Sequence, residues 1–194
     1  MYKAVLDTCV LVPGIQRDFL LQLAAEGAFA PLWSSGVLNE LLDVLNRIDE
    51  KKNRSARGNR HAVLVRRMSG AFPGAEVRAP RDREYGYRLR DPDDEHVLHA
   101  ALMSGADAIV TDDQRAGLLE SDIVREASIE ILTGDEFMTN TVYAHHDRAV
   151  NAVLTLYRRR RNPPVESPAA ILAHLCRSAE LAELYDLLID DLTE

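Results

Sequence analysis

Short apolar runs alternate with longer amphipathic stretches along the first 140 residues of the chain. The apolar runs have the length and composition of buried strands, and they cover residues 3–7, 29–33, 75–77, 108–111 and 129–132. Between them, apolar residues recur every three or four positions, as in helices, over 13–25, 35–45, 61–72 and 94–104. Strands that alternate with helices predict an α/β domain with a mostly parallel sheet.

Local signals place several of the helix ends. Pro13 suits the first turn of a helix, and Ser34 or Ser35 can cap the next one. Gly105 is expected to end the helix that Asp94 opens. The segment 133–136, Thr-Gly-Asp-Glu, has the spacing of a capping box and is expected to start a short helix.

Beyond residue 140 the pattern is helical only. We expect one helix over 142–161, a break at 162–164, a restart at Ser167-Pro168 and an amphipathic stretch over 181–192, divided from the rest near Ser178. The chain is therefore expected to consist of a sheet domain, 1–139, and a helical C-terminal extension, 140–194. Leucines recur on one face of the last stretch, so we expect it to dock within the same chain.

Composition narrows the class of protein. The chain has 194 residues, of which 46% are hydrophobic, with a net charge of −8, which excludes a disordered chain and a generic nucleic-acid-coating protein. No apolar run has the ~20 residues of a membrane helix. The N-terminus lacks a signal-peptide pattern and the two cysteines form no disulfide framework, so a cytoplasmic location is expected.

The charge is strongly segregated along the chain. Residues 47–90 contain 13 Lys and Arg against 5 Asp and Glu, whereas residues 91–140 contain 2 against 13. A basic segment followed by an acidic one suits a metal-dependent phosphodiesterase, in which cations hold a polyanion and carboxylates hold metals. The alternative is that each block is a solvated face.

Four separated acids are placed to meet at one edge of the sheet. Asp7 follows the first strand, Asp113 follows the strand at 108–111, Asp94 opens the preceding helix and Glu40 lies on the helix after the second strand. In open parallel sheets the working crevice lies at the carboxyl ends of the strands. Clustered carboxylates repel one another, and a divalent cation such as Mg²⁺, which prefers oxygen ligands, relieves that repulsion.

Each acid also has a simpler explanation. A carboxylate at the start of a helix, such as Asp94 or Asp113, can be a cap, and Glu40 can be an exposed helix position. Asp7 is the strongest candidate, because an acid at the end of a central strand is costly unless it has a use.

Together, these motifs resemble those of the PIN domain, and within it the VapC-type toxin components of bacterial toxin–antitoxin systems. The resemblance covers about residues 2–138 and is carried by Leu6-Asp7-Thr8-Cys9-Val10-Leu11, Leu38-Asn39-Glu40-Leu41, Asp91-Pro92-Asp93-Asp94 and Ala106-Asp107-Ala108-Ile109-Val110-Thr111-Asp112-Asp113. It implies a PIN-like three-layer α/β/α fold with a mostly parallel sheet, here with a C-terminal helical extension.

The resemblance also implies an activity, that of an endoribonuclease dependent on Mg²⁺ or Mn²⁺ that leaves a 5′-phosphate product. The implied catalytic and metal-binding residues are Asp7, Glu40, Asp94 and Asp113, supported by Thr8, Thr111 and Asp112. The implied partners are RNA, a cognate antitoxin protein and, as an open question, further copies of the chain. The residues expected to hold the RNA backbone are Lys51, Lys52, Arg54, Arg57, Arg60 and Arg158 to Arg161.

Two other functions stay open from the sequence. One is a catalytically silent PIN scaffold that binds RNA or a protein partner. The other is a HAD-like phosphatase, which the residue Cys9 disfavours because that chemistry needs a second acid there. We expect Cys9 to behave as a buried small hydrophobe, Trp33 to lie in the core, and His96 and His99 to have surface or packing roles.

Overall fold

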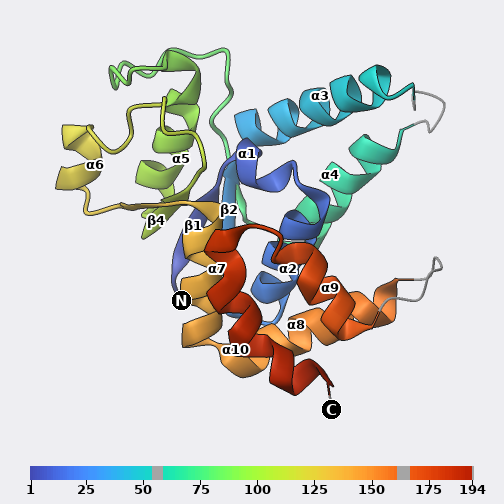
Figure 1. The fold of residues 1–194 in the computed structure, drawn as a ribbon. Coiled ribbons are helices and arrows are strands. Elements are labelled where there is room, and N and C mark those ends of the chain that lie inside the picture. Colours follow the sequence, from blue (N-terminus) through green and yellow to red (C-terminus); the bar gives the residue numbers. More distant parts are fainter. Residues whose placement is uncertain (54–58, 161–166, 194) are drawn as a thin grey trace. The chain divides into compact units, whose positions relative to one another are not determined.

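The computed structural model describes residues 1–53, 59–160 and 167–193. Figure 1 shows the arrangement of the helices and strands. By their contacts, the residues divide into two compact units. The sheet unit comprises residues 3–12 and 31–131, and the helical unit comprises residues 1–2, 13–30 and 132–194.

A parallel sheet organises the first of these units. Within the described residues it has five strands, in the order β3-β2-β1-β4-β5. Their bounds are β1 (Lys3–Leu6), β2 (Ala30–Ser34), β3 (Glu76–Val77), β4 (Ala108–Val110) and β5 (Glu130–Leu132). All five runs predicted as strands are strands, and the expected α/β class with a mostly parallel sheet is confirmed.

The strand order explains where a site can form. The chain builds β1, β2 and β3 outward in one direction, then returns to place β4 against the other side of β1, with Ala4 opposite Ala108 and Leu6 opposite Val110. The order therefore reverses at β1. The crevice at the carboxyl ends of the strands beside such a reversal is where ligands bind in open α/β sheets. The residues that follow β1 and β4 flank it.

Short helices and loops connect these strands. The helices of the sheet unit are α1 (Thr8–Leu11), α3 (Ser35–Lys51), α4 (Arg60–Ala71), the 3₁₀ helix η2 (Pro92–Asp94), α5 (Glu95–Ser104) and α6 (Asp122–Glu126). Ser34 caps α3, as its Oγ accepts a hydrogen bond from the Val37 backbone N–H at 2.8 Å. Gly105 ends α5 in the left-handed conformation, as predicted.

Apolar side chains of the helices and the strands form the core of this unit. Trp33 is fully buried, as expected, and its ring meets that of Phe72 edge to face with centroids 6.0 Å apart. Leu41 of α3, Leu98 of α5 and Ile109 of β4 are also fully buried. The stripes read from the sequence are thus the buried faces of these helices.

One polar segment differs from its prediction. The polar composition of residues 49–60 favours an exposed segment, but Asp49 in the last turn of α3 is buried. Its carboxylate accepts a hydrogen bond from His61 Nε2 at 2.7 Å and pairs with Arg60. The reason is that α3 and α4 pack together, so an acid near the end of one helix meets Arg60 and His61 at the start of the other.

The helical unit contains α2 and all helices after β5. Their bounds are α2 (Gly14–Ala25), α7 (Gly134–Ala144), α8 (His146–Arg159), α9 (Pro168–Leu175), the 3₁₀ helix η3 (Ala179–Leu181) and α10 (Ala182–Thr193). The capping box at Thr133 and Glu136 is formed, and Ser167 caps α9 with Pro168 in its first turn. Ser178 precedes η3, which separates α9 from α10 as predicted.

The single helix expected over 142–161 is wrong. The capping box starts a helix that continues to Ala144, and a second helix begins at His146. His145 between them leaves helical geometry, with φ −141° and ψ 50°. The break lets the buried residues of α7, such as Phe137 and Val142, and those of α8, such as Val153, share one core. Neither Gly nor Pro marks this break in the sequence.

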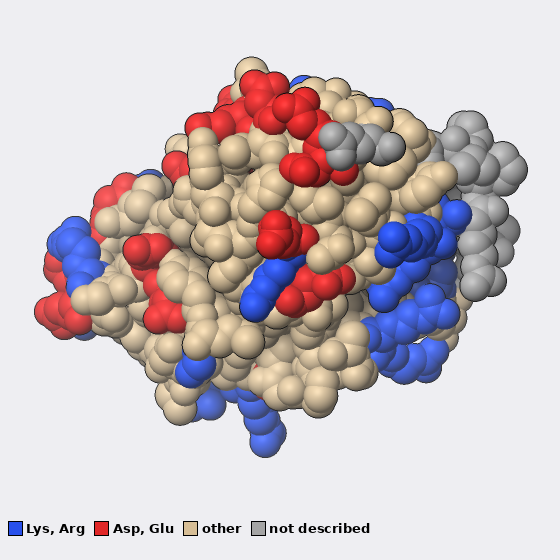
Figure 2. Space-filling model, turned by 90° about the horizontal axis from the view of Figure 1, so that it is seen from below, with Lys and Arg blue, Asp and Glu red and all other residues tan. Residues whose placement is uncertain are grey.

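The last helix docks within the chain, as expected. α10 packs against α7, α8 and α9, and the side chains of Leu184, Leu188 and Leu192 are buried. Figure 2 shows one face on which Lys and Arg side chains gather at the right and Asp and Glu side chains gather at the top, with smaller mixed groups at the centre and left. Among the described residues, no helix is long and apolar enough to cross a bilayer.

The division into a sheet domain, 1–139, and a C-terminal extension, 140–194, stays a prediction, and a truncation within the extension tests whether the chain folds without its last helices. A chain that ends at Arg160 keeps α8, which packs on α2, but loses α9 and α10. We expect it to retain its helical circular dichroism and to be less soluble, because the faces that α10 covers on α7 and α8 become exposed. An unfolded spectrum would show that the whole chain forms one inseparable fold.

Candidate active site

Asp7 lies at the centre of the candidate site, directly after β1, and is only 6% exposed. Its Oδ1 accepts a hydrogen bond from the Thr8 backbone N–H at 2.6 Å, which caps α1. Its Oδ2 accepts from Thr111 Oγ1 at 2.7 Å and from Cys9 Sγ at 3.2 Å. Residues that follow β1 and residues that follow β4 therefore meet on one carboxylate.

The electrostatic state of Asp7 suits a cation site. Burial raises the pKa of its carboxyl above the ordinary value, and the negative charge of Glu40 adds to that effect. Hydrogen bonds from Thr111, Cys9 and Thr8 act in the opposite direction without cancelling it. The site thus holds a buried acid whose charged form a nearby cation would stabilise.

Glu40 joins this group through Thr8. The Thr8 hydroxyl donates to Glu40 Oε2 at 2.8 Å, and Arg81 Nη1 lies 3.7 Å from Glu40 Oε1. Glu40 is on α3, whose start is fixed by Ser34 at the end of β2. It is half-buried and bound into the site, so the reading of Glu40 as a free, exposed helix position does not hold.

Asp94 does not serve as a helix cap. It occupies the N-cap position of α5, but its side chain makes no capping hydrogen bond. Asp91 is the residue that caps the preceding turn, since its Oδ1 accepts from the Asp93 backbone N–H at 3.0 Å. The capping explanation that the sequence left open for Asp94 is therefore excluded.

The pKa of Asp94 shows that the four acids share one electrostatic field. Burial and, in decreasing order, the negative charges of Asp7, Asp91, Asp113 and Glu40 together raise this pKa to about 7. The fold thus brings together all four acids that the sequence singled out.

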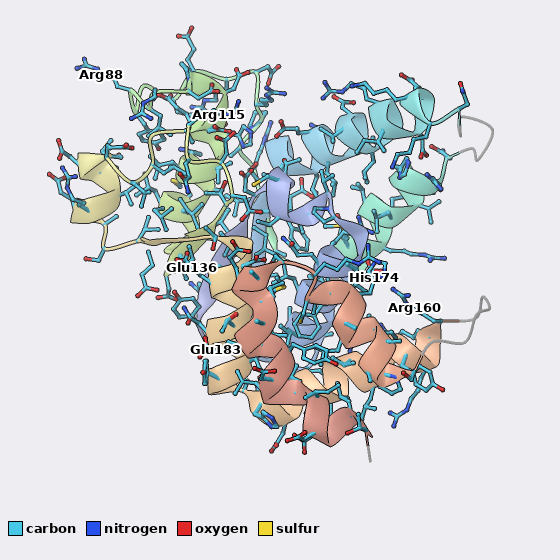
Figure 3. All side chains as sticks on the ribbon, viewed as in Figure 1. Arg88, Arg115, Glu136, Arg160, His174 and Glu183 are labelled. Atoms are coloured by element: carbon cyan, nitrogen blue, oxygen red, sulfur yellow. The ribbon has the colours of Figure 1, made fainter. Side chains whose placement is uncertain are left out.

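Asp113 is linked to Asp7 through Thr111. The Asp113 backbone N–H donates to Thr111 Oγ1 at 3.1 Å, and that hydroxyl donates to Asp7. The Asp113 carboxylate accepts from Arg115, with Nε at 3.1 Å and Nη2 at 2.8 Å, and these bonds hold the pKa of Asp113 below its usual range. Figure 3 labels Arg115 on the loop after β4.

Arginines compensate part of the negative charge. Arg115 binds Asp113, and Arg81 binds Asp93 at 2.7 Å and lies near Glu40. Among the described residues, no three His, Cys, Asp or Glu side chains are already arranged around one cation position. The atoms available to a cation are carboxylate and hydroxyl oxygens, which Mg²⁺ and Mn²⁺ prefer as ligands. The residues therefore fit such an ion, provided that Arg81 and Arg115 release the carboxylates they bind.

Cys9 has a more polar role than the sequence suggested. Its thiol is half-buried, donates to Asp7 and accepts from the Asp112 backbone N–H at 3.1 Å. Burial and the charge of Asp7 raise the pKa of the thiol to about 12. Cys9 is therefore a neutral hydrogen-bond donor to the site and no nucleophile.

The remaining residues named from the sequence lie outside this cluster. Asp112 is exposed, and its backbone N–H donates to Cys9 Sγ at 3.1 Å. Lys51 and Lys52 are exposed at the end of α3, and Arg60 is paired with Asp49. Arg54, Arg57 and Arg161 lie outside the described residues.

His96 and Gly36 are positioning residues that the sequence did not single out for the site. The His96 ring is 1% exposed, and its Nδ1 lies 2.8 Å from Ser34 Oγ. A Cβ on Gly36 would lie 2.9 Å from His96 Cγ, so only glycine lets α3 approach this ring. His96 follows Asp94 by two residues and Gly36 precedes Glu40 by one turn, so this contact sets the spacing of two acids. A glycine inside a helical pattern was the signal for it.

A substitution at this contact gives the first test of the site. We expect Gly36→Ala to push α3 away from α5, to lower the free energy of unfolding by about 1–3 kcal/mol and to weaken Mn²⁺ binding. The matched control is Gly70→Ala on α4, where a Cβ meets nothing within 4 Å. Urea unfolding and Mn²⁺ titration measure both effects. Equal behaviour of the two variants would contradict the positioning role.

Asp94 predicts a pH dependence of stability in metal-free protein. Its folded pKa of about 7 exceeds the ordinary value of 3.8. The folded state therefore holds more protons between these values, and the free energy of unfolding falls as pH rises through that window.

The variant Asp94→Asn tests this dependence, because an amide mimics the protonated acid. With a chelator present, its free energy of unfolding should exceed that of the wild type by about 1–2 kcal/mol above pH ~7 and should equal it below pH ~4. Urea unfolding at both pH values measures this difference, with the exposed Asp43→Asn as control. A gain that is independent of pH would contradict the assignment.

Comparison with known proteins gives the family. The sequence pattern of the PIN domain matches residues 3–115, which include all four acids. No curated protein and no solved structure matches the chain. The expected PIN-like α/β/α fold with C-terminal helices is confirmed, and the phosphatase interpretation loses its basis. Because the match spans more than half of its length, this chain belongs to the PIN-domain family.

Proposed function

We propose that the protein is an endoribonuclease that hydrolyses phosphodiester bonds of RNA with Mg²⁺ or Mn²⁺. PIN domains have a nuclease-type fold and typically use these ions, which supports the general class. The observation that carries the proposal is the convergence of three acids from separate segments, Glu40, Asp94 and Asp113, around the buried Asp7, since Asp94 makes no capping hydrogen bond that would explain its presence.

The residues of this site divide into ligands and supports. Asp7, Glu40, Asp94 and Asp113 would hold the cation through carboxylate oxygens. A bound divalent ion supplies a nucleophile at neutral pH and stabilises charge on the phosphate. Thr8 and Thr111 orient the acids, because the hydroxyl of Thr8 holds Glu40 and that of Thr111 holds Asp7.

Basic residues at the rim would hold the RNA. Arg81 and Arg115 are exposed, and each binds an acid of the site or a neighbour of one. Once a cation neutralises these acids, the two guanidinium groups can turn to substrate phosphates. Lys51 and Lys52 are exposed at the end of α3, and we propose that they also bind RNA phosphates. The same role is proposed for Arg54, Arg57 and Arg60. Single-stranded or looped RNA suits such a site best, since its backbone is accessible.

The biological role proposed for this activity is that of the toxin in a toxin–antitoxin pair. The support is the order and spacing of the motifs in the sequence, which resemble those of VapC-type toxins. A small antitoxin gene beside this one, with inhibition of cleavage by its product, is the observation that tests the role.

A catalytically silent PIN scaffold is the second candidate. The arginine contacts at Asp113 and near Glu40 favour it, because such contacts can neutralise acids permanently. Titration with Mn²⁺ separates the two candidates, since a silent scaffold has no need to bind the ion.

Substitution of the central acid tests the enzyme directly. We expect Asp7→Asn to lower the rate of RNA cleavage in Mg²⁺ by at least about 100-fold, because a first ligand to the ion loses its charge. Stability without metal should hold or rise, since a like charge leaves the cluster. The control is Asp18→Asn, an exposed acid on α2. Full activity of Asp7→Asn would refute the proposal.

A further inference from the structure

A cavity of about 460 Å³ lies in the sheet unit beside the candidate active site. One wall is the segment 87–90, and the other is formed by Gly117 and the segment 120–123. Residues 87–90 lead directly into Asp91–Asp94, and Gly117 follows the loop that carries Asp113. The two chain segments that line the cavity are therefore continuous with those that carry two of the acids.

The first wall is held in place by Glu95. This residue is 5% exposed, and its carboxylate accepts hydrogen bonds from the backbone N–H groups of residues 86–89, including that of Leu89 at 3.3 Å. Arg88 takes a positive φ of 60° within this segment. Because Glu95 is adjacent to Asp94, the same turn fixes the cavity wall and one acid.

The second wall is closely packed against the first. Gly117 has φ 79°, and a Cβ there would lie 2.9 Å from the Arg90 Cβ. The Asp91 backbone N–H donates to the Ala116 carbonyl at 3.4 Å, and Arg90 Nη2 lies 3.0 Å from Glu120 Oε1. The cavity is thus a built part of the fold.

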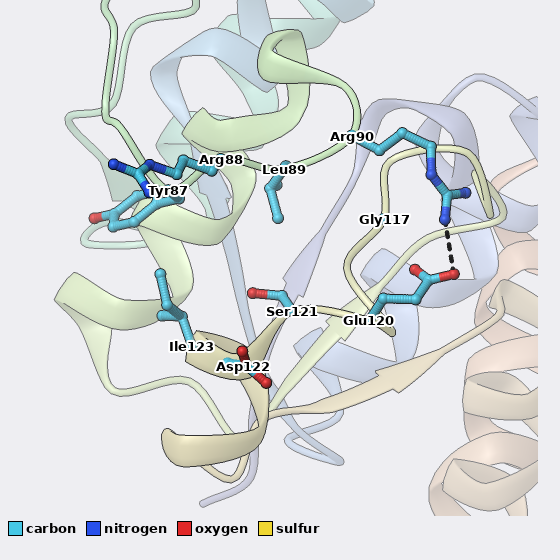
Figure 4. Close-up of a pocket in the computed structure, with 9 residues that line it drawn as sticks. All are labelled: Tyr87, Arg88, Leu89, Arg90, Gly117, Glu120, Ser121, Asp122 and Ile123. Carbon is cyan, nitrogen blue, oxygen red and sulfur yellow. Dashed lines mark hydrogen bonds and ion pairs between the residues drawn. The ribbon is translucent and has the colours of Figure 1, made fainter.

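The lining combines a flat aromatic group with polar groups. Tyr87 is anchored by a hydrogen bond of 2.7 Å between its hydroxyl and His99 Nδ1. Figure 4 shows Tyr87 and Arg88 on the side opposite Ile123. Ser121 and Asp122 add hydrogen-bonding groups beside Ile123. Aromatic and aliphatic walls with a few polar groups are typical of pockets for flat, partly polar ligands.

From this arrangement we propose that the cavity is a nucleobase subsite, which takes one base of a single-stranded RNA next to the bond that is cut. The inference rests on the proposed ribonuclease function and adds to it the part of the substrate that this chain recognises. A base packs against Tyr87 and Ile123, and its polar edge meets the Ser121 hydroxyl, whereas the carboxylates of Glu120 and Asp122 are held by Arg90 and Arg125. The ribose-phosphate backbone passes along the rim, where the exposed Arg88 lies.

The test fills the cavity and measures the contribution of bases to binding. Ile123→Trp fills it, and Glu126→Trp adds the same side chain at an exposed position of α6 outside the lining. Both are made in the Asp7→Asn background to prevent cleavage. The probes are a labelled five-nucleotide RNA and the same ribose-phosphate chain without bases, in Mg²⁺.

With Glu126→Trp, removal of the bases should weaken binding about 5- to 150-fold, the effect of stacking one base. With Ile123→Trp, the two probes should bind with nearly equal affinity, while binding of the base-free chain stays unchanged. The same ratio in both variants would overturn the proposal. If Ile123→Trp is unfolded by circular dichroism, Tyr87→Leu takes its place and must give the same loss.

The outcomes also separate this inference from the proposed function. If the wild-type chain cleaves RNA and the ratio is unaffected by Ile123→Trp, the nuclease assignment stands and the subsite does not exist. If the wild-type chain cleaves no RNA in Mg²⁺ or Mn²⁺, the proposed function fails, whatever the ratio shows.

Discussion

The buried carboxylate of Asp7 is the constraint around which this site is built. An acid at the end of the central strand has lost its water, and further acids lie close enough to raise its free energy. The protein offsets this cost with three donors, Thr8, Cys9 and Thr111, taken from segments after β1 and β4. Each of these residues also forms a further hydrogen bond: Thr8 to Glu40, Cys9 to the Asp112 backbone and Thr111 to the Asp113 backbone. The residues that stabilise the charge of Asp7 therefore also bring the acids together.

Three consecutive residues at the start of α5 have three different structural roles. Asp94 faces the other acids, Glu95 holds the backbone of residues 86–89, and His96 packs against Gly36 on α3. Successive side chains on a helix point about 100° apart. One turn at the start of α5 can therefore fix an acid, a cavity wall and the spacing between two helices at once.

The arginines explain how an acidic cluster folds without its cation. Arg115 takes Asp113, and Arg81 takes Asp93 and approaches Glu40. Both guanidinium groups are exposed, so these pairs are weak and exchangeable. In the proposed nuclease a divalent ion, with its higher charge density, would compete with such pairs, and the displaced arginines would be free to contact substrate phosphates.

The sequence by itself determined the class of fold and the chemistry of its acids. Strand runs and helical stripes are local patterns, so β1 to β5, the cap at Ser34 and the end at Gly105 could be read from neighbouring residues. Asp7, Glu40, Asp94 and Asp113 could be named because parallel strands bring their carboxyl ends to one edge.

Only the tertiary structure decided which groups touch. The break at His145, the burial of Asp49 and the contact of Gly36 with His96 all join residues far apart in the sequence or depend on packing between helices. No local pattern carries such information, because the partner of a polar or small side chain is set by the three-dimensional register of helices and strands.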